Sequence, residues 1–101
     1  MKTVELKCTQ EFYVNGQVAS ESYWLNDKRH NDNGPAYREW YENGQVKYEI
    51  YYLNGKYHND NGTAFRAWYE NGLVVYETYY LNGVMLSKEK FEKRNDGLFH
   101  L

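Results

Sequence analysis

The chain has 101 residues, the length of a single domain with a modest hydrophobic core. Acidic residues outnumber basic ones by 14 to 12, and this balance disfavours a nucleic-acid surface. Cys8 is the one cysteine, which excludes an intramolecular disulfide and favours a reducing compartment. The sequence shows neither a signal peptide nor an apolar run long enough to span a membrane, so we expect a soluble cytoplasmic protein without membrane contact.

The sequence repeats itself with a period of 28 residues. Residues 23–50 and 51–78 align without gaps and are identical at 19 of 28 positions. The ends of a repeat array are usually atypical, because each end must face water. We therefore predict one repeat domain over residues 1–101. Its parts are a degenerate half repeat, two full repeats, a truncated repeat and a capping helix, at 1–22, 23–50, 51–78, 79–86 and 87–96.

Each full repeat contains two Asn-Gly steps between runs rich in Tyr, Trp, Val and Ile. This pattern predicts β-hairpins with type I′ turns, in which both turn residues have positive φ. The predicted strands, in chain order, lie near 4–14, 17–25, 36–42, 45–53, 56–58, 64–70, 73–81 and 84–86. The expected fold is mainly β. It is an antiparallel β-meander of Asn-Gly hairpins in a single twisted sheet, with a short C-terminal α-helix.

The position of each turn sets the register of its hairpin, and the register sets the two faces of the sheet. In the first full repeat it places Tyr37 opposite Ile50 and Trp40 opposite Lys47, and the second repeat closes in the same way. One face then carries the tyrosines Tyr37, Tyr41, Tyr48, Tyr69, Tyr76 and Tyr80. The other face mixes ion pairs with aromatic side chains.

The residues after the truncated repeat predict a helix. Ser87 is a preferred N-cap, and Glu89 lies in the first turn, where the helix dipole favours a negative charge. Gly97 is the expected C-terminal stop. Phe91 is the main apolar anchor, so we expect the helix to cover one end of the sheet.

Segments 40–44 and 51–56 read Trp-Tyr-Glu-Asn-Gly and Tyr-Tyr-Leu-Asn-Gly-Lys, and they resemble the repeats of MORN-variant proteins. The segments His-Asn-Asp-Asn-Gly at 30–34 and 58–62 look like those of a subgroup from bacteria, phages and large DNA viruses. The resemblance covers about residues 11–94. It implies hairpin repeats that bind other proteins, with antitoxin-like relatives. An antitoxin or a phage-encoded inhibitor of a host defence enzyme or nuclease, acting in the cytoplasm of a bacterium or infected host cell, is therefore one expectation.

The two His-Asn-Asp-Asn-Gly segments are also the candidates for chemistry. His30 with Asp32, and His58 with Asp60, are metal-ligand types, but zinc needs three or four ligands and calcium five or more oxygens. The favoured interpretation is a tight loop in which Asn and Asp bond their own backbone and Gly takes positive φ. The sequence lacks a phosphate loop, a nucleophile elbow and a zinc-protease motif. We predict no enzymatic activity, no cofactor and no metal.

Trp, Tyr and Arg are the residue types enriched at interface hot spots. The predicted partner-binding surface is the mixed face, with Trp40, Trp68, Tyr51, Tyr79, Arg38 and Arg66. The tyrosine face is the alternative, either as a core or as an interface with a partner or a second copy in a homodimer. Two other functions stay open: a single-stranded nucleic-acid binder that stacks bases on Tyr and Trp, and a purely structural assembly unit.

Overall fold

The computed structural model describes residues 6–99 of the chain, and side chains as far as residue 94. Residues 4 and 5 of the first predicted strand lie outside this range. The elements are β1 (Leu6–Phe12), β2 (Val18–Leu25), β3 (Lys28–Arg29), β4 (Tyr37–Trp40), β5 (Val46–Ile50), β6 (Tyr52–Leu53), β7 (Lys56–Tyr57), β8 (Phe65–Trp68), β9 (Val74–Leu81), β10 (Val84–Leu86) and α1 (Lys88–Phe99). All described strand pairs are antiparallel, so the predicted mainly β fold with a C-terminal helix is confirmed.

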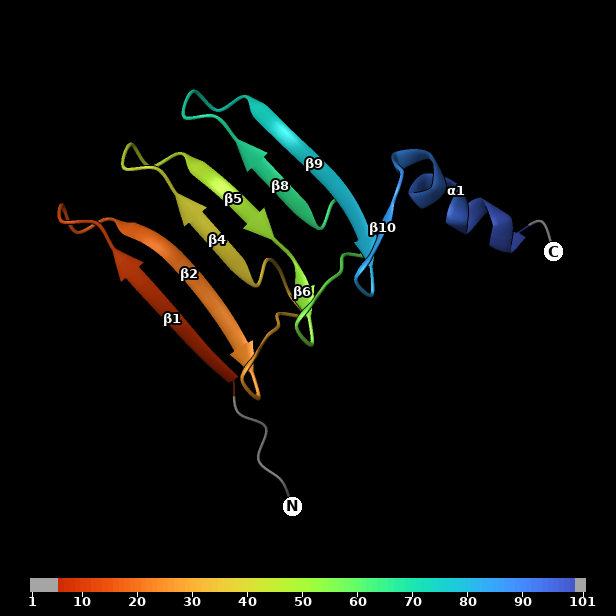
Figure 1. Ribbon diagram of the computed structural model, residues 1–101, viewed down its shortest axis with the longest axis horizontal. Helices are drawn as coiled ribbons and strands as arrows, with labels where there is room; N and C mark the ends of the chain where they lie inside the picture. The colour runs from red at the N-terminus through yellow and green to blue at the C-terminus, as the bar shows by residue number, and fades with distance from the viewer. Residues whose placement is uncertain (1–5, 100–101) are drawn as a thin grey trace, which may run out of the picture.

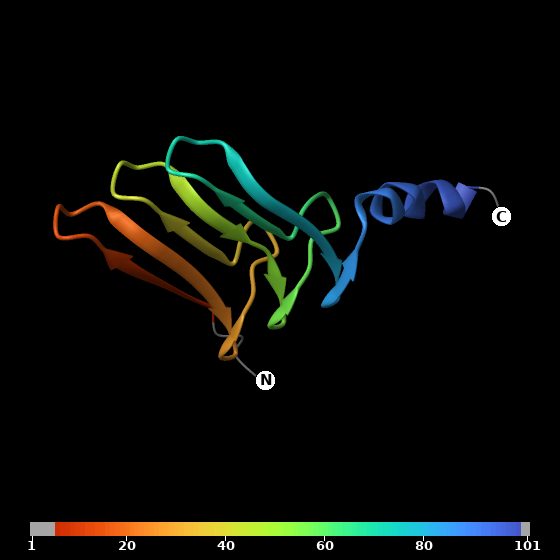
Figure 2. The ribbon, with the colours of Figure 1, turned by 45° about the horizontal axis from the view of Figure 1, so that its top comes forward.

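Three long hairpins, β1–β2, β4–β5 and β8–β9, lie side by side in a curved sheet (Figures 1 and 2). The strand order is β1-β2-β4-β5-β8-β9-β10, with β3 paired to β2. Short hairpins extend from the opposite end of the long ones, and β6–β7 forms a two-stranded sheet of its own. The molecule measures 55 × 47 × 17 Å, so most of the sheet is one layer thick.

The short hairpins have the predicted turn type. Asn54 and Asn82 both have φ of 49°, and the glycines that follow them have φ of 80° and 81°. Positive φ at both positions defines the type I′ turn, whose twist matches that of the strands. A third turn of this kind, which Asn-Gly steps alone did not predict, uses Asn26 and Asp27 with φ of 49° and 66°.

The long hairpins have a different turn, and the predicted type I′ turn is wrong there. Only Gly44 takes positive φ in the first full repeat, at 89°. The amide of Gly44 donates to the carbonyl of Tyr41, and the amide of Tyr41 donates to the carbonyl of Gln45. This is a three-residue loop with glycine in the left-handed position. The side-chain oxygen of Asn43 accepts from the Gln45 amide at 2.9 Å and stabilises the loop.

The register of the long hairpins is partly as predicted. Tyr37 lies opposite Ile50, as expected from the turn position. Nearer the turn, Trp40 lies opposite Val46 instead of Lys47, so Lys47 has no partner in the ladder. Such an extra residue is a β-bulge, and it compensates for the additional residue of the loop. The same irregularity occurs in the other two long hairpins.

Helix α1 begins as predicted and ends later. The Ser87 hydroxyl oxygen accepts from the Lys90 amide at 3.1 Å, which is the N-cap bond. Gly97 lies inside the helix, which continues to Phe99, so the predicted stop is wrong. Glycine costs a helix interior only about 1 kcal/mol and does not by itself end it. No described helix is long and apolar enough to cross a membrane.

The hydrophobic core is small. Five hydrophobic residues are buried, and no large side chain within the described part of the chain is fully buried: Ala36, Ile50, Ala64, Ala67 and Phe91 form this set. The two completely buried residues, Ala36 and Ala64, donate their amides to the carbonyls of Ile50 and Thr78 in the next repeat. Contacts between repeats therefore carry much of the fold.

Candidate functional site

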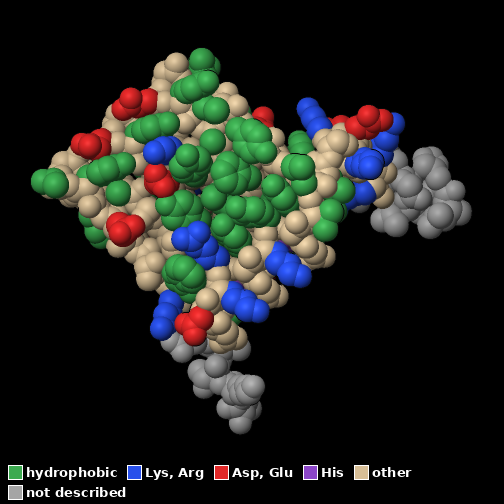
Figure 3. Space-filling model, viewed as in Figure 1, with side chains coloured by type: hydrophobic (Ala, Val, Ile, Leu, Met, Phe, Trp, Pro, Cys, Tyr) green, Lys and Arg blue, Asp and Glu red, His purple; other side chains and the backbone are tan. Residues whose placement is uncertain are grey.

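Aromatic rings form a connected cluster on one face of the sheet. Phe65 lies at its centre and makes edge contacts with Tyr48, Tyr57 and Tyr76, at centroid distances of 5.9, 6.3 and 5.6 Å. Tyr57 comes from the short hairpin β6–β7, and its ring also packs against Tyr80 at 4.8 Å. Hydrophobic side chains gather over this part of the sheet (Figure 3). The short hairpin thus covers part of the face that the register made aromatic.

A cation closes the cluster on the side of the first repeat. The Arg29 guanidinium lies over the rings of Trp24, Tyr37 and Tyr52, at 5.2, 4.7 and 5.7 Å from their centroids. The Tyr37 hydroxyl donates to a Glu39 carboxylate oxygen at 2.6 Å. Burial, together with this bond to a carboxylate, raises the pKa of Tyr37 to about 12. Tyr37 is therefore engaged in internal contacts.

The six tyrosines of the predicted face fall into two groups. Tyr37, Tyr41, Tyr48 and Tyr80 are half-buried, as residues of a core would be. Tyr69 and Tyr76, in the last long hairpin, are 56% and 50% exposed. The difference follows from the repeat. The Tyr41 hydroxyl donates to the Trp68 carbonyl of the next repeat at 2.8 Å, whereas no further repeat follows β9.

The hairpin β8–β9 carries the largest group of exposed apolar side chains along the chain. We call it the apolar hairpin surface, and it consists of Tyr69, Leu73, Val74, Val75 and Tyr76. Each of these residues is between 47% and 64% exposed. The equivalent positions of the first full repeat carry Gln45 in place of Leu73 and Lys47 in place of Val75. The chain is therefore more apolar in the hairpin that is more exposed.

The same hairpin presents an open strand edge. Strand β9 pairs with β8 on one side, and β10 covers only residues 79–81 on the other. Residues 74–78 have no neighbouring strand on that side in the described sheet. An exposed edge with apolar side chains is suited to pairing with another chain. The sequence prediction did not include Leu73, Val74 and Val75, although comparing the two repeats position by position would have singled out two of them.

A row of alternating charges crosses the other face. In register across five strands lie Glu21, Arg38, Glu49, Arg66 and Glu77. Arg38 is 2.8 Å from the Glu49 carboxylate, and Arg66 is 2.6 Å from that of Glu77. Each half-exposed pair contributes about 0.2–1 kcal/mol. The two predicted arginines are thus placed between carboxylates.

The two predicted tryptophans are half-buried, and each has an arginine beside it. The Arg38 and Arg66 guanidinium groups lie 5.8 Å from the ring centroids of Trp40 and Trp68, respectively. The carbonyl of Trp68 accepts the interrepeat bond from Tyr41. These side chains contribute to packing within the array and do not form one open surface with Tyr51 and Tyr79.

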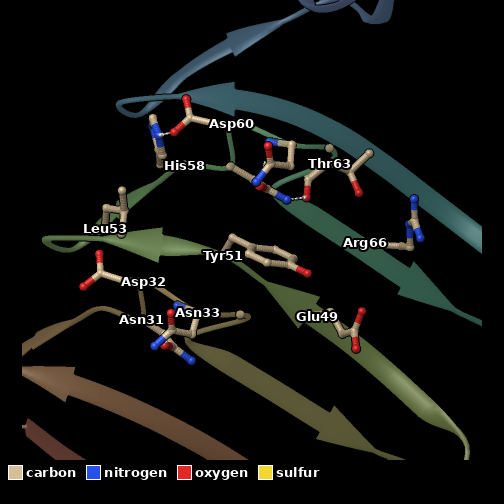
Figure 4. Close-up of a pocket in the computed structure, with 14 residues that line it drawn as sticks. Asn31, Asp32, Asn33, Glu49, Tyr51, Leu53, His58, Asp60, Thr63 and Arg66 are labelled. Carbon is tan, nitrogen blue, oxygen red and sulfur yellow. Dashed lines mark hydrogen bonds and ion pairs between the residues drawn. The ribbon is translucent and has the colours of Figure 1, made fainter.

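Tyr79 and Tyr51 occupy equivalent positions with different surroundings. The Tyr79 ring packs against Phe91 of α1, with 4.5 Å between centroids. The Tyr51 ring faces a cleft of about 470 Å³ between the loops at 31–34 and 58–63 (Figure 4). Leu53 shares the floor of the cleft with Tyr51. The structure therefore separates the six predicted site residues into three environments.

The loops beside the cleft are tied by their own side chains. His30 accepts at Nδ1 from the Asn54 amide at 2.9 Å, so its proton is on Nε2, 3.1 Å from the Asp32 carboxylate. Asn31 bonds a carbonyl four residues later and the amide of Asn33. The same bonds recur around His58. The predicted loop bonding is confirmed, and each histidine also joins its loop to the next repeat.

The predicted positive φ at the glycines of these loops is wrong. Gly34 and Gly62 are outside the left-handed region. The side chains of Asn31 and Asn59 bridge the loops instead, and a left-handed residue is not needed. Within the described residues, no group of three or more His, Cys, Asp or Glu side chains is placed to hold a metal ion.

Comparisons of the chain with protein-family models, with curated proteins and with solved structures gave no significant match. The MORN-variant resemblance therefore stays a prediction.

Proposed function

We propose that this chain is a non-catalytic protein–protein interaction module, which acts stoichiometrically and docks through the apolar hairpin surface. The observation that carries the proposal is the exposure of Leu73 and Val75, at 64% and 47%, where the preceding repeat has Gln and Lys. Removing such side chains from water on binding contributes about 25 cal/mol per Å². The open edge of β9 adds main-chain groups that a partner strand can pair with.

The charges favour a protein partner over a single nucleic-acid strand. Arg38 and Arg66 each contact a carboxylate, so their guanidinium groups are not free for phosphates. The rings of Tyr48, Phe65 and Tyr57 contact one another and leave few open faces for bases. An antitoxin-like protein, or an inhibitor of a host defence enzyme, would act by covering a site in this way. The exposed thiol of Cys8 suits the reducing cytoplasm.

The test converts the second hairpin to the composition of the first. The double variant Leu73→Gln and Val75→Lys has the residues that the chain itself uses one repeat earlier. It should fold normally, because both positions are exposed and lie in an otherwise unchanged hairpin. Wild type and variant are used as baits in host lysate, and the captured proteins are quantified by mass spectrometry. A partner that binds wild type in a defined stoichiometry and is lost with the variant is expected.

The matched control is the conservative pair Gln45→Glu and Lys47→Arg in the first hairpin, which should keep the partner. Equal capture by all three proteins, or no protein enriched over empty resin, would contradict the proposal. Growth of the protein beyond a dimer in light scattering would instead favour the structural assembly unit.

A further inference from the structure

The chain's own helix shows what a cleft of this fold accepts. At the end of the array, the Phe91 ring of α1 lies on the Tyr79 ring at 33° and is only 8% exposed. One helical turn later, Arg94 donates to the carbonyl of Asp60, and its guanidinium also lies 3.9 Å from the Asp60 carboxylate. The guanidinium carbon is 4.2 Å from the Phe91 centroid. An aromatic ring and an arginine three residues apart therefore occupy a tyrosine and an aspartate of the repeat.

The same pair of receptor residues occurs one repeat earlier. Tyr51 and Asp32 precede Tyr79 and Asp60 by 28 residues, and both line the cleft of Figure 4. Thr63 stands 28 residues before Phe91, and its short side chain leaves the Tyr51 ring facing the open cleft.

The arginine that precedes Arg94 by one repeat does not fill the role either. Arg66 is bound to Glu77 at 2.6 Å, on the next strand of the sheet. The Asp32 side chain is 73% exposed and contacts His30 alone among the ion pairs of the described chain. The cleft therefore has an aromatic floor and an accessible carboxylate, and no part of the described chain fills it.

We infer that this central cleft binds a helix of a partner protein that presents an aromatic side chain to Tyr51 and, three residues later, an arginine to Asp32. The volume of about 470 Å³ accommodates an aromatic side chain and the end of an arginine. Asp32, Glu49 and Asp60 line the cleft against the single positive charge of Arg66, so its charge complements a cation. This site lies on the face opposite the aromatic cluster and adds a second contact to the apolar hairpin surface.

The probe is a free peptide with the sequence of residues 86–101, added to the full-length protein. The tethered α1 stays on Tyr79, because a short connection gives it an effective concentration in about the millimolar range. We expect saturable binding, with amide shifts in NMR spectra at Asp32, Asn33 and Tyr51. Peptides with Phe91→Ala or Arg94→Ala should bind about tenfold more weakly or worse.

The matched protein variants are Asp32→Asn, in the cleft, and Asp27→Asn, which makes the same charge change in an exposed turn outside it. Asp32→Asn should weaken the peptide about tenfold and Asp27→Asn should leave it unchanged. Absence of saturable binding, shifts confined to other residues, or equal affinity for both variants would overturn the inference. The Leu73→Gln and Val75→Lys protein should bind the peptide normally, so failure of the proposed function and failure of this site are distinguishable.

Discussion

Removing one hydroxyl should show how strongly the repeats hold one another. Tyr41→Phe deletes the 2.8 Å bond from the phenol to the Trp68 carbonyl, 27 residues later, and keeps the ring. The Lys47 ammonium, 5.5 Å from the Tyr41 centroid, retains its aromatic contact. A hydrogen bond of this kind contributes about 0.5–1.5 kcal/mol net. We expect a loss of about 1 kcal/mol in the free energy of unfolding, which lowers Tm by about 4–8 °C in a domain of this size.

The chain supplies its own control at the equivalent position of the next repeat. Tyr69 is 56% exposed, and no repeat follows to provide a carbonyl for its hydroxyl. Tyr69→Phe makes the identical chemical change where the hydroxyl meets water. Its effect should stay within about 0.5 kcal/mol, as for other surface substitutions.

Urea denaturation of the three proteins measures the difference. Equal losses for Tyr41→Phe and Tyr69→Phe would refute the reasoning, because the interrepeat bond distinguishes the two sites. A negligible loss for Tyr41→Phe would mean that water replaces the phenol at the Trp68 carbonyl without cost.

Glycine and tyrosine substitutions test two other features. Gly44→Ala should cost about 1–2 kcal/mol in urea denaturation, because Gly44 has φ of 89°, whereas Gly34→Ala should be neutral or stabilise by about 0.4–1 kcal/mol. A loss at Gly34 as large as at Gly44 would contradict this. The raised pKa of Tyr37, about 12 against about 10 unfolded, contributes stability that is present below pH 10 and is lost as the pH rises through 12. Glu39→Gln should lower that pKa in a difference titration of tyrosinate absorbance against Tyr37→Phe, and an unchanged curve would count against the role of Glu39.

The β fold could be predicted because the signals that determine it are local. Two-residue alternation and Asn-Gly steps indicate hairpins, and in the short hairpins Asn54 and Asn82 take the positive φ that the turn requires. The far part of the long hairpin, with Tyr37 opposite Ile50, was also predicted correctly. That part of the register survives because the bulge at Lys47 compensates for the longer loop.

Two features of the loops were not readable from the same dipeptides. Asn-Gly gives a type I′ turn in one hairpin and a three-residue loop in another, and the difference depends on bonds made by residues on either side. The amide of Gly55 donates to the carbonyl of Arg29 in the preceding repeat, whereas Gly44 is held by Tyr41 within its own hairpin. Composition predicted glycine in the left-handed region at Gly34, where an asparagine side chain supplies the closure instead.

The candidate site was predicted less well than the fold, because burial in a repeat array depends on position along the array. Trp40, Trp68 and Tyr79 are aromatic residues of the kind found at interfaces, yet neighbouring repeats or α1 contact them. The same residue type becomes accessible only where the next repeat is missing, as at Tyr69. Sequence identity between repeats therefore predicts the fold, and the place of a residue in the array decides its exposure.

Differences between the two full repeats are consequently the more informative signal for binding. Positions that are identical, such as the Asn-Gly loops and the His-Asn-Asp-Asn-Gly segments, are explained by bonds that every repeat makes. Leu73 and Val75 depart from the repeat where no interrepeat contact requires it, and both departures expose apolar surface at an open edge. Exposed apolar side chains do not stabilise the hairpin that carries them. A partner that covers them accounts for their presence, and it also removes the pairing hazard of the β9 edge.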